Sequence, residues 1–289
     1  MSTDKIDLSN AAPTVNEQRA LHQTQMEQAA AGGEDDIQVP VASVSIPSRG
    51  KIYPVESPLH NRGEIDIKSM TAKEEDILTS MPLLKQGKAM SALLRSCIID
   101  KSIDPEQMLV GDRNAVLIAI RVSGYGAEYD GKLDCPECTE SFDHVFSLGH
   151  IPMKELKVEP VEEGRNLFYF ELPVLKKRVV FKLLTGAEER ELNTLQDRSR
   201  KARGVGAQES NVTMRLLHQV VSIGAVNDRQ KLAKMIRNIP ARDSLGLRKY
   251  IDEISPGVEL KGNVTCPACG EESEVDVPFG ADFFWPELK

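Results

Sequence analysis

The sequence lacks the short motifs that mark common enzyme sites. It has no Gly-x4-Gly-Lys-Ser/Thr phosphate loop, no Gly-x-Gly-x-x-Gly fingerprint, no Gly-x-Ser-x-Gly elbow and no His-Glu-x-x-His pair. Its five histidines are scattered along the chain. Acidic pairs such as Glu74-Glu75 stand in predicted first helical turns, where the helix dipole favours negative charge. The sequence therefore predicts a protein that is not an enzyme and has no small-molecule substrate.

Long apolar runs and a basic excess are also missing. No stretch reaches the roughly 18 consecutive apolar residues that a membrane span needs. Residues 1–7 do not resemble a secretory signal, so we expect the thiols to stay reduced in a cytoplasmic setting. The net charge of −8 at pH 7 disfavours a nucleic-acid partner, which normally requires a basic face.

Four of the five cysteines form two Cys-Pro-x-Cys turns. These are Cys135-Pro136-Glu137-Cys138 and Cys266-Pro267-Ala268-Cys269, each between two alternating, strand-like runs. Four thiolates satisfy a tetrahedral zinc ion, and each tight turn aims both of its sulfurs at one point. The turns are separated by residues 139–265, far more than the roughly 15–20 residues of a usual two-turn site. We predict one structural zinc ion per chain, bound by Cys135, Cys138, Cys266 and Cys269.

Other uses of these turns remain open at the level of sequence. One alternative is that each pair of thiols is redox-active, but neither pair stands at a strand-to-helix junction as a thioredoxin-like motif would. The other alternative is that the thiols are reduced and idle. A catalytic zinc is disfavoured because four sulfur ligands leave no position for water or substrate. The fifth cysteine, Cys97, lies in an apolar run and is predicted to be a small buried side chain.

The sequence also indicates an internal duplication. Each copy is predicted to hold a strand (64–68 or 179–183), a helix that starts at a Thr-x-x-Glu capping box (Thr71 or Thr185), an amphipathic helix (85–99 or 211–223), a helix that begins near Asp112 or Asp243, and a cysteine hairpin. Asp112 and Asp243, Gly131 and Gly262, and Cys135 and Cys266 are each 131 residues apart. Chance resemblance between helices is the alternative, and the equal spacing argues against it.

The predicted fold is therefore α+β, with two similar strand-plus-helices halves joined by a split zinc-ribbon-like pair of hairpins. Composition and pattern predict five segments: a disordered tail (1–36), an extended arm (37–63), a first repeat (64–150), a β-linker that contains a hairpin connection (151–178) and a second repeat (179–289).

Two places are candidates for contact with a partner. Arg198, Arg200, Lys201 and Arg203 crowd a predicted loop, which is either solvated or in contact with an acidic surface or a phosphate backbone. The run Phe283-Phe284-Trp285 near the end of the chain is either a strap across the core or an exposed anchor for a partner subunit.

Several passages together resemble the baseplate hub protein family of T-even-like contractile-tailed phages. They are Ile46-Pro47-Ser48-Arg49-Gly50 with Tyr53-Pro54, the phrase from Met70 to Leu78, Gly87 with the later Leu93-Leu94-x-x-Cys97-Ile98, and Phe283-Phe284-Trp285-Pro286. The resemblance covers roughly residues 40–289. It implies a non-catalytic structural subunit in the central hub of a tail baseplate, in contact with other tail subunits. It places the protein in the virion and, during assembly, in the host cytoplasm.

The predicted function is thus that of a structural or assembly subunit of a contractile phage tail baseplate. The alternative is a zinc-ribbon nucleic-acid-binding or transcription-related protein. The acidic net charge disfavours that alternative, whereas the basic residues from Arg198 to Arg203 favour it.

Overall fold

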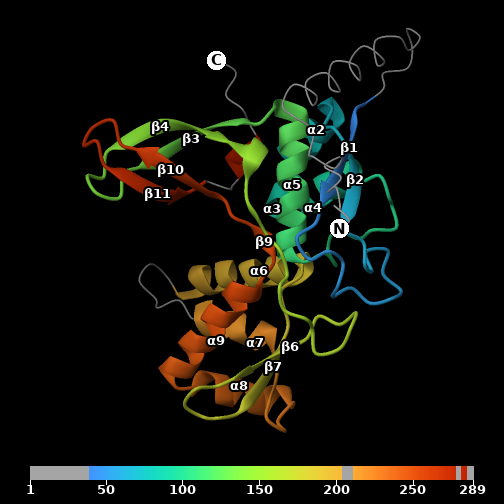
Figure 1. Cartoon of the computed structure of the whole chain (residues 1–289), viewed down its shortest axis with the longest axis vertical. Helices are drawn as coiled ribbons and strands as arrows, with labels where there is room; N and C mark the ends of the chain where they lie inside the picture. The colour runs from blue at the N-terminus through green and yellow to red at the C-terminus, as the bar shows by residue number, and fades with distance from the viewer. Residues whose placement is uncertain (1–38, 204–210, 278–280, 285–289) are drawn as a thin grey trace, which may run out of the picture. The chain divides into compact units, whose positions relative to one another are not determined.

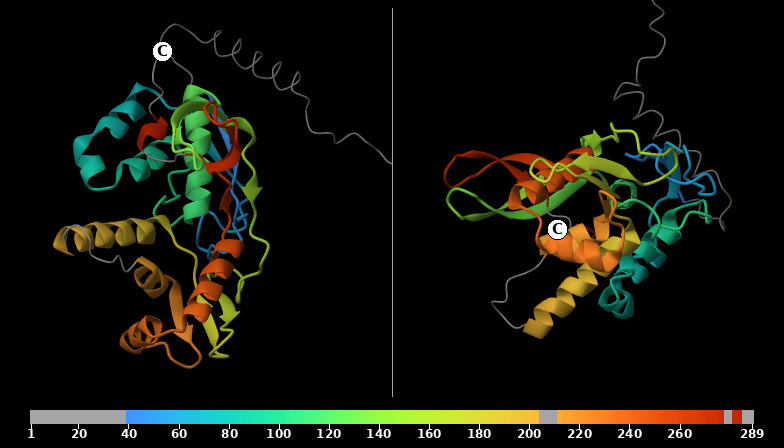
Figure 2. Two further views of the ribbon diagram at one scale, coloured as in Figure 1. Left: turned by 90° about the vertical axis from the view of Figure 1, so that its left-hand side faces the viewer. Right: turned by 90° about the horizontal axis from the view of Figure 1, so that it is seen from below.

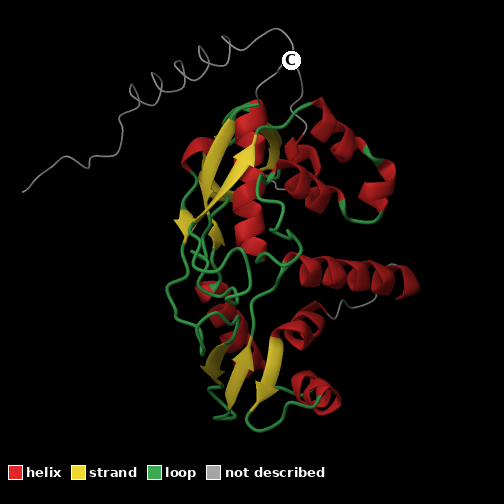
Figure 3. Cartoon of the chain, turned by 90° about the vertical axis from the view of Figure 1, so that its right-hand side faces the viewer, coloured by secondary structure: helices red, strands yellow, loops and turns green. Residues whose placement is uncertain are grey.

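The computed structural model describes residues 39–203, 211–277 and 281–284. Helices and short antiparallel sheets alternate along this part of the chain, so the predicted α+β class is confirmed (Figures 1 and 3). The predicted tail, residues 1–36, lies outside the described residues. None of the described helices is both long and apolar enough to cross a bilayer.

The first half of the chain builds one strand pair, four helices and one hairpin. In chain order these elements are β1 (Val41–Ser45), β2 (Glu64–Lys68), α2 (Ala72–Thr79), α3 (Met81–Lys85), α4 (Ala89–Cys97), α5 (Val110–Tyr125), β3 (Glu128–Asp134) and β4 (Ser141–Ser147). Strand β2 alternates apolar and charged residues, which buries Ile65 and Ile67 and exposes Glu64 and Asp66. Helix α5 ends at Gly126, whose φ of 84° suits glycine.

The second half also contains helices, a small sheet and a hairpin, with several further short elements. After η1 (Leu148–His150) and β5 (Met153–Lys154) come β6 (Phe168–Glu171), β7 (Arg178–Phe181), α6 (Gly186–Arg203), α7 (Asn211–Gln219), β8 (Val220–Ile223), α8 (Arg229–Arg237), α9 (Ala241–Ile254), β9 (Gly257–Val258), β10 (Lys261–Thr265), β11 (Glu272–Asp276) and η2 (Ala281–Phe284). Strands β6, β7 and β8 form an antiparallel sheet, and Asp228 caps α8 through the backbone N–H of Lys231.

Helix α5 is the element around which the other parts are arranged. In Figure 1 it stands between the two hairpins and the strand pair β1–β2. Its residues Val116 and Ile120 are fully buried in the core. Its first turn lies against the short strand β9, and a Cβ at Gly111 would lie 1.9 Å from the carbonyl oxygen of Pro256. Only glycine permits this approach.

Both predicted capping boxes are present. The Glu74 carboxylate accepts the backbone N–H of Thr71 at 3.0 Å and its hydroxyl at 2.5 Å. In the second half Glu188 accepts the backbone N–H of Thr185 at 3.0 Å. The box satisfies N–H groups that the first helical turn leaves without a partner.

Several predicted boundaries are wrong. The helix predicted for residues 85–99 begins only at Ala89, because Gly87 has a φ of 64° and separates it from α3. The helix predicted for residues 211–223 ends at Gln219, and Val220–Ile223 pair with β7 as strand β8. The segment predicted as a basic loop belongs to α6 up to Arg203. Helix α8 was not predicted.

Candidate metal centre

Each cysteine turn joins the two strands of a hairpin in the same way. The N–H of Cys135 donates to the Glu140 carbonyl, and the N–H of Cys266 donates to the Glu271 carbonyl, both at 2.9 Å. Strands β3 and β4 pair from Glu128 to Ser147, and β10 pairs with β11 from Lys261 to Asp276. The strand ladders therefore fix the position at which each turn presents its sulfurs.

The backbone conformation of the two turns is also the same. Thr139 and Gly270 follow the first cysteine of their turns by four residues and have φ values of 60° and 74°. Each donates its N–H to the carbonyl of that first cysteine, at 2.9 and 2.8 Å. The two turns are thus built alike although their sequences differ.

The structure brings the four cysteine sulfurs together. All four lie within 4.8 Å of one another. The Sγ atoms of Cys135 and Cys269 are 3.8 Å apart, and those of Cys138 and Cys266 are 3.7 Å apart. A tetrahedron whose corners lie about 2.3 Å from its centre, the Zn–S distance, has edges of about 3.8 Å. The spacing therefore fits one ion held by both hairpins.

Burial and neighbouring donors make the four thiols unequal. Cys135 and Cys266 are buried, whereas Cys138 and Cys269 are exposed. Backbone N–H groups of Cys269 and Ala268 stabilise the Cys266 thiolate and lower its pKa to about 7. The backbone of Glu140 favours the Cys138 thiolate, but the neighbouring sulfurs outweigh it and raise the pKa of Cys138 to about 12. A dication supplies the positive charge that lets all four sulfurs ionise together.

A phenyl ring lies between the two hairpins. A Cβ at Gly131 on β3 would lie 2.9 Å from the ring of Phe146, and one at Gly262 on β10 would lie 2.7 Å from the same ring. Phe146 is buried between two glycines that are 131 residues apart. In the sequence these glycines stand out only as equally spaced landmarks, although a glycine inside a strand signals a close approach.

Arg121 on α5 ties the first hairpin to the last described segment of the chain. The buried guanidinium donates to the carbonyl oxygens of Gly126, Glu128 and Phe283 at 2.6, 2.8 and 3.0 Å. The Phe283 ring lies 5.0 Å from the ring of Tyr129, measured between centroids. These contacts support the base of β3, and sequence reasoning missed Arg121 because a single arginine in an apolar helix carries no motif.

Of the residues predicted to contact a partner, those that the structure describes lie on η2 and α6, not on the cysteine turns. Phe283 and Phe284 are buried, at 0% and 1% exposure, in the manner of a strap across the core. Trp285 lies outside the described residues. Arg198 is exposed on α6, and Arg200, Lys201 and Arg203 belong to the same helix. Partner binding by these residues stays a prediction.

A cavity of about 650 Å³ lies where the start of α5 meets β9. Its lining mixes cations such as Lys154 with carboxylates such as Asp252. Lys154 donates to the Asp252 carbonyl, and Lys261 pairs with Glu274 at 2.7 Å. Lys154 and Lys261 on the wall of the cavity are therefore both engaged by neighbouring groups.

One comparison with known proteins gives a match. A family model described as T4 bacteriophage base plate protein matches residues 41–285, which leaves out only the first 40 and the last four residues. No curated protein and no solved structure matches the chain.

Proposed function

Because the chain belongs to the T4 bacteriophage base plate protein family, we propose that it is a building block of the hub region of a contractile tail baseplate, closed by one structural zinc ion. Family membership supports a structural subunit of the phage tail that contacts other tail subunits. The position in the hub and the identity of the metal are the proposed parts. The observation that carries the zinc is the cluster of four sulfurs from two distant turns.

Zinc suits this site better than other metals. Four thiolates in tetrahedral arrangement select zinc or iron, and a zinc-ribbon-like pair of turns is typical of structural zinc. Four sulfur ligands fill the coordination sphere, so the ion would have no open position for a substrate. This supports a non-catalytic role for the centre.

We also propose that the two halves are copies of one ancestral unit. Lys68 pairs with Glu74 across the start of α2, and Lys182 pairs with Glu188 across the start of α6, both pairs being 114 residues apart in sequence. The strand pair β1–β2 corresponds to β6–β7 in this scheme. Each copy would then begin one strand earlier than the predicted boundaries at residues 64 and 179.

A second pair of contacts supports the same relation. Asp112 in the first turn of α5 accepts the backbone N–H of Ser48, which lies between β1 and β2, at 2.9 Å. Asp243 in the first turn of α9 accepts the N–H groups of Val174 and Leu175, which lie between β6 and β7, at 2.6 and 3.0 Å. Both carboxylates are fully buried. Two buried aspartates in a similar structural role 131 residues apart support the proposed duplication.

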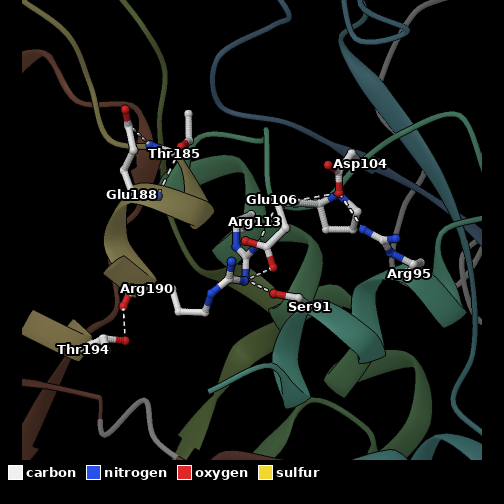
Figure 4. A network of polar contacts seen from close by, with 10 residues as sticks. Ser91, Arg95, Asp104, Glu106, Arg113, Thr185, Glu188, Arg190 and Thr194 are labelled. Atoms are coloured by element: carbon white, nitrogen blue, oxygen red, sulfur yellow. Dashed lines mark hydrogen bonds and ion pairs between the residues drawn. The ribbon is translucent and has the colours of Figure 1, made fainter. Parts of the chain in front are cut away.

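The halves also meet at a polar junction remote in sequence from the cysteines (Figure 4). Arg190 on α6 pairs with Glu106, which precedes α5. Arg113 on α5 donates to the Pro105 carbonyl at 2.7 Å and to the Ser91 hydroxyl at 3.2 Å. With this junction in place, loss of the metal should separate the hairpins without unfolding the helices.

Two measurements test the proposal. Elemental analysis of the purified chain should give one zinc ion per chain, and zero or two would overturn the shared site. Cys97→Ala is the matched control, since Cys97 is buried away from the cluster and its loss should leave the zinc content unchanged. Cross-linking within purified tail particles should join the chain to central baseplate subunits. Cross-links confined to peripheral baseplate proteins would contradict the hub position.

A further inference from the structure

The turn of β6–β7, helix α8 and residues 241–249 of α9 concentrate positive charge in an acidic chain. Segments 172–178 and 229–249 hold ten lysines and arginines and one carboxylate, Asp243, so their formal charge is +9 in a chain of −8. We call this surface the basic end. All ten cations are exposed: Lys176, Lys177, Arg178, Arg229, Lys231, Lys234, Arg237, Arg242, Arg248 and Lys249.

Neighbouring carboxylates offset part of this charge, because Asp228 caps α8 and the last turn of α9 carries the exposed Asp252 and Glu253. None of the ten cations forms an ion pair with another described residue. Asp243 is buried and already accepts two backbone N–H groups. Such a surface attracts an acidic partner over several ångströms.

The basic end also exposes several apolar side chains. Val174, Leu175 and Leu245, next to Asp243 in space or in sequence, are 48%, 40% and 46% exposed. The matching place in the first half is covered, because Leu156 donates its N–H to the Pro47 carbonyl and Arg49 pairs with Glu155. Apolar side chains framed by cations favour a protein surface over a nucleic acid.

The two hairpins carry the opposite charge. Segments 128–147 and 259–276 hold eleven carboxylates and two lysines, a formal charge of −9. We call this surface the acidic arm. Its exposed carboxylates are Glu128, Asp130, Asp134, Glu137, Glu140, Asp143, Glu259, Glu271, Glu272, Glu274 and Asp276. Val145 on β4 adds an apolar side chain that is 54% exposed.

We propose that the basic end of one chain binds the acidic arm of a second copy, head to tail. The formal charges of the two surfaces are opposite, and both surfaces expose apolar groups: Val145 on the arm, and Val174, Leu175 and Leu245 on the basic end. In Figures 1 and 2 the hairpins and α8 are separate parts of the ribbon. The two surfaces of one contact are different, so every pair retains a free arm and a free basic end. Repetition of such a contact builds a closed ring if the rotations between successive copies add up to a full turn, and an open-ended chain if they do not.

This inference goes beyond the proposed function and does not require the metal to be zinc. Sedimentation velocity of the full chain tests it over a series of concentrations. At about 50 mM salt we expect species larger than the monomer, and at about 500 mM salt we expect mainly monomer, because salt screens exposed charges. Three charge reversals in the basic end, Lys176→Glu, Lys177→Glu and Lys249→Glu, should weaken self-association about tenfold or more.

Complementary reversals make the test specific. Glu128→Lys, Asp143→Lys and Glu272→Lys in the acidic arm should also yield monomers, and mixing the two triple variants should restore the larger species. The matched control, Lys73→Glu, Lys85→Glu and Lys88→Glu, changes three exposed lysines elsewhere and should associate like the natural sequence. A metal content equal to that of the natural sequence checks that the arm is intact.

Several results would overturn the inference. A monomer at every salt concentration would exclude the contact, and so would association that the triple variants do not weaken. Failure of the mixture to associate would show that the two surfaces do not meet. Salt-dependent binding of duplex DNA by a chain that stays monomeric would assign the basic end to nucleic acid instead.

Discussion

Asp112 and Asp243 occupy matching positions in the two halves, yet they hold their neighbours in different ways. Asp112 accepts the Ser48 hydroxyl and the Tyr53 hydroxyl, each at 2.6 Å, as well as one backbone N–H. Asp243 accepts two backbone N–H groups. The first half therefore needs side chains from a long connection between its strands, whereas the second half needs only a tight turn. Each half thus uses a buried aspartate as an anchor, but the segments that the two aspartates hold are different.

The same contrast appears at the start of α2 and α6. Glu74 is fully buried and accepts Lys68 at 2.8 Å and the Ser96 hydroxyl at 2.6 Å in addition to its capping contacts. The Glu188 side chain is 21% exposed and pairs with Lys182. The first half thus depends on buried polar networks more than the second half does. Four pairs of substitutions, one member in each half, test this comparison between the two halves.

The largest effect is expected where the halves are proposed to share one ion. Cys135→Ser and Cys266→Ser should each abolish stoichiometric zinc binding and lower the melting temperature by on the order of 10 °C. The double variant should be no worse than either single one, because each loss already breaks the site. Calorimetry with elemental analysis checks this. Fully additive losses would mean that the hairpins do not share a metal.

The next largest loss of stability is expected from substitution of the two buried aspartates. Asp112→Ala should cost about 4 kcal/mol of unfolding free energy, because it leaves the buried Ser48 and Tyr53 hydroxyls without their acceptor. Asp243→Ala should cost about 2 kcal/mol, since two backbone N–H groups of an exposed turn can turn to water. Urea unfolding measures both. Equal costs would contradict the unequal anchoring of the two halves.

The buried Glu74 predicts a pH dependence in the first half. Burial opposes its ionisation, but hydrogen bonds from Lys68, Ser96 and Thr71 outweigh burial and lower its pKa to about 2 from an ordinary 4.5. The carboxylate therefore contributes about 3 kcal/mol above pH 4.5, and this contribution is lost as the pH falls toward 2.

The corresponding substitutions separate the two halves. Glu74→Gln should remove that acid-dependent contribution, whereas Glu188→Gln should cost about 1 kcal/mol, because its side chain is partly exposed. Unfolding free energies measured between pH 3 and pH 7 give both values. If the unfolding free energy of Glu74→Gln changed with pH in the same way as that of the natural protein, Glu74 would not be the source of the acid-dependent stability.

The last comparison concerns the glycines beside Phe146, where both halves are expected to respond by a similar, modest amount. Gly131→Ala and Gly262→Ala should each cost about 2 kcal/mol, because the new methyl group overlaps the ring. Adding Phe146→Leu should recover part of each loss, which a double-mutant cycle measures. Gly257→Ala is the control, since the nearest atom to its Cβ is 3.9 Å away. No coupling with Phe146 would show that the ring does not set the hairpin spacing.

Local signals predicted the elements well where the chemistry is local. The capping boxes at Thr71 and Thr185 and the strand Glu64–Lys68 stand as predicted, because a cap and an alternation involve only near neighbours in sequence. The family resemblance is confirmed at the level of a T4-like phage baseplate protein. The predictions failed where distant packing decides. Val220–Ile223 follow a helical pattern, but pairing with β7 makes them a strand.

The sequence alone determined that two cysteine turns of one kind exist and that each lies between two strands. Cysteine spacing and apolar–polar alternation depend only on residues that are close in sequence. Only the tertiary structure decided that the turns meet. The approach depends on Gly262, which admits the Phe146 ring, and on Arg121, which binds the Phe283 carbonyl, and each of these contacts joins residues more than 100 positions apart. It also decided which cations gather on one surface, because α8 and α9 place theirs outward only after Leu232, Ile236 and Leu247 are buried.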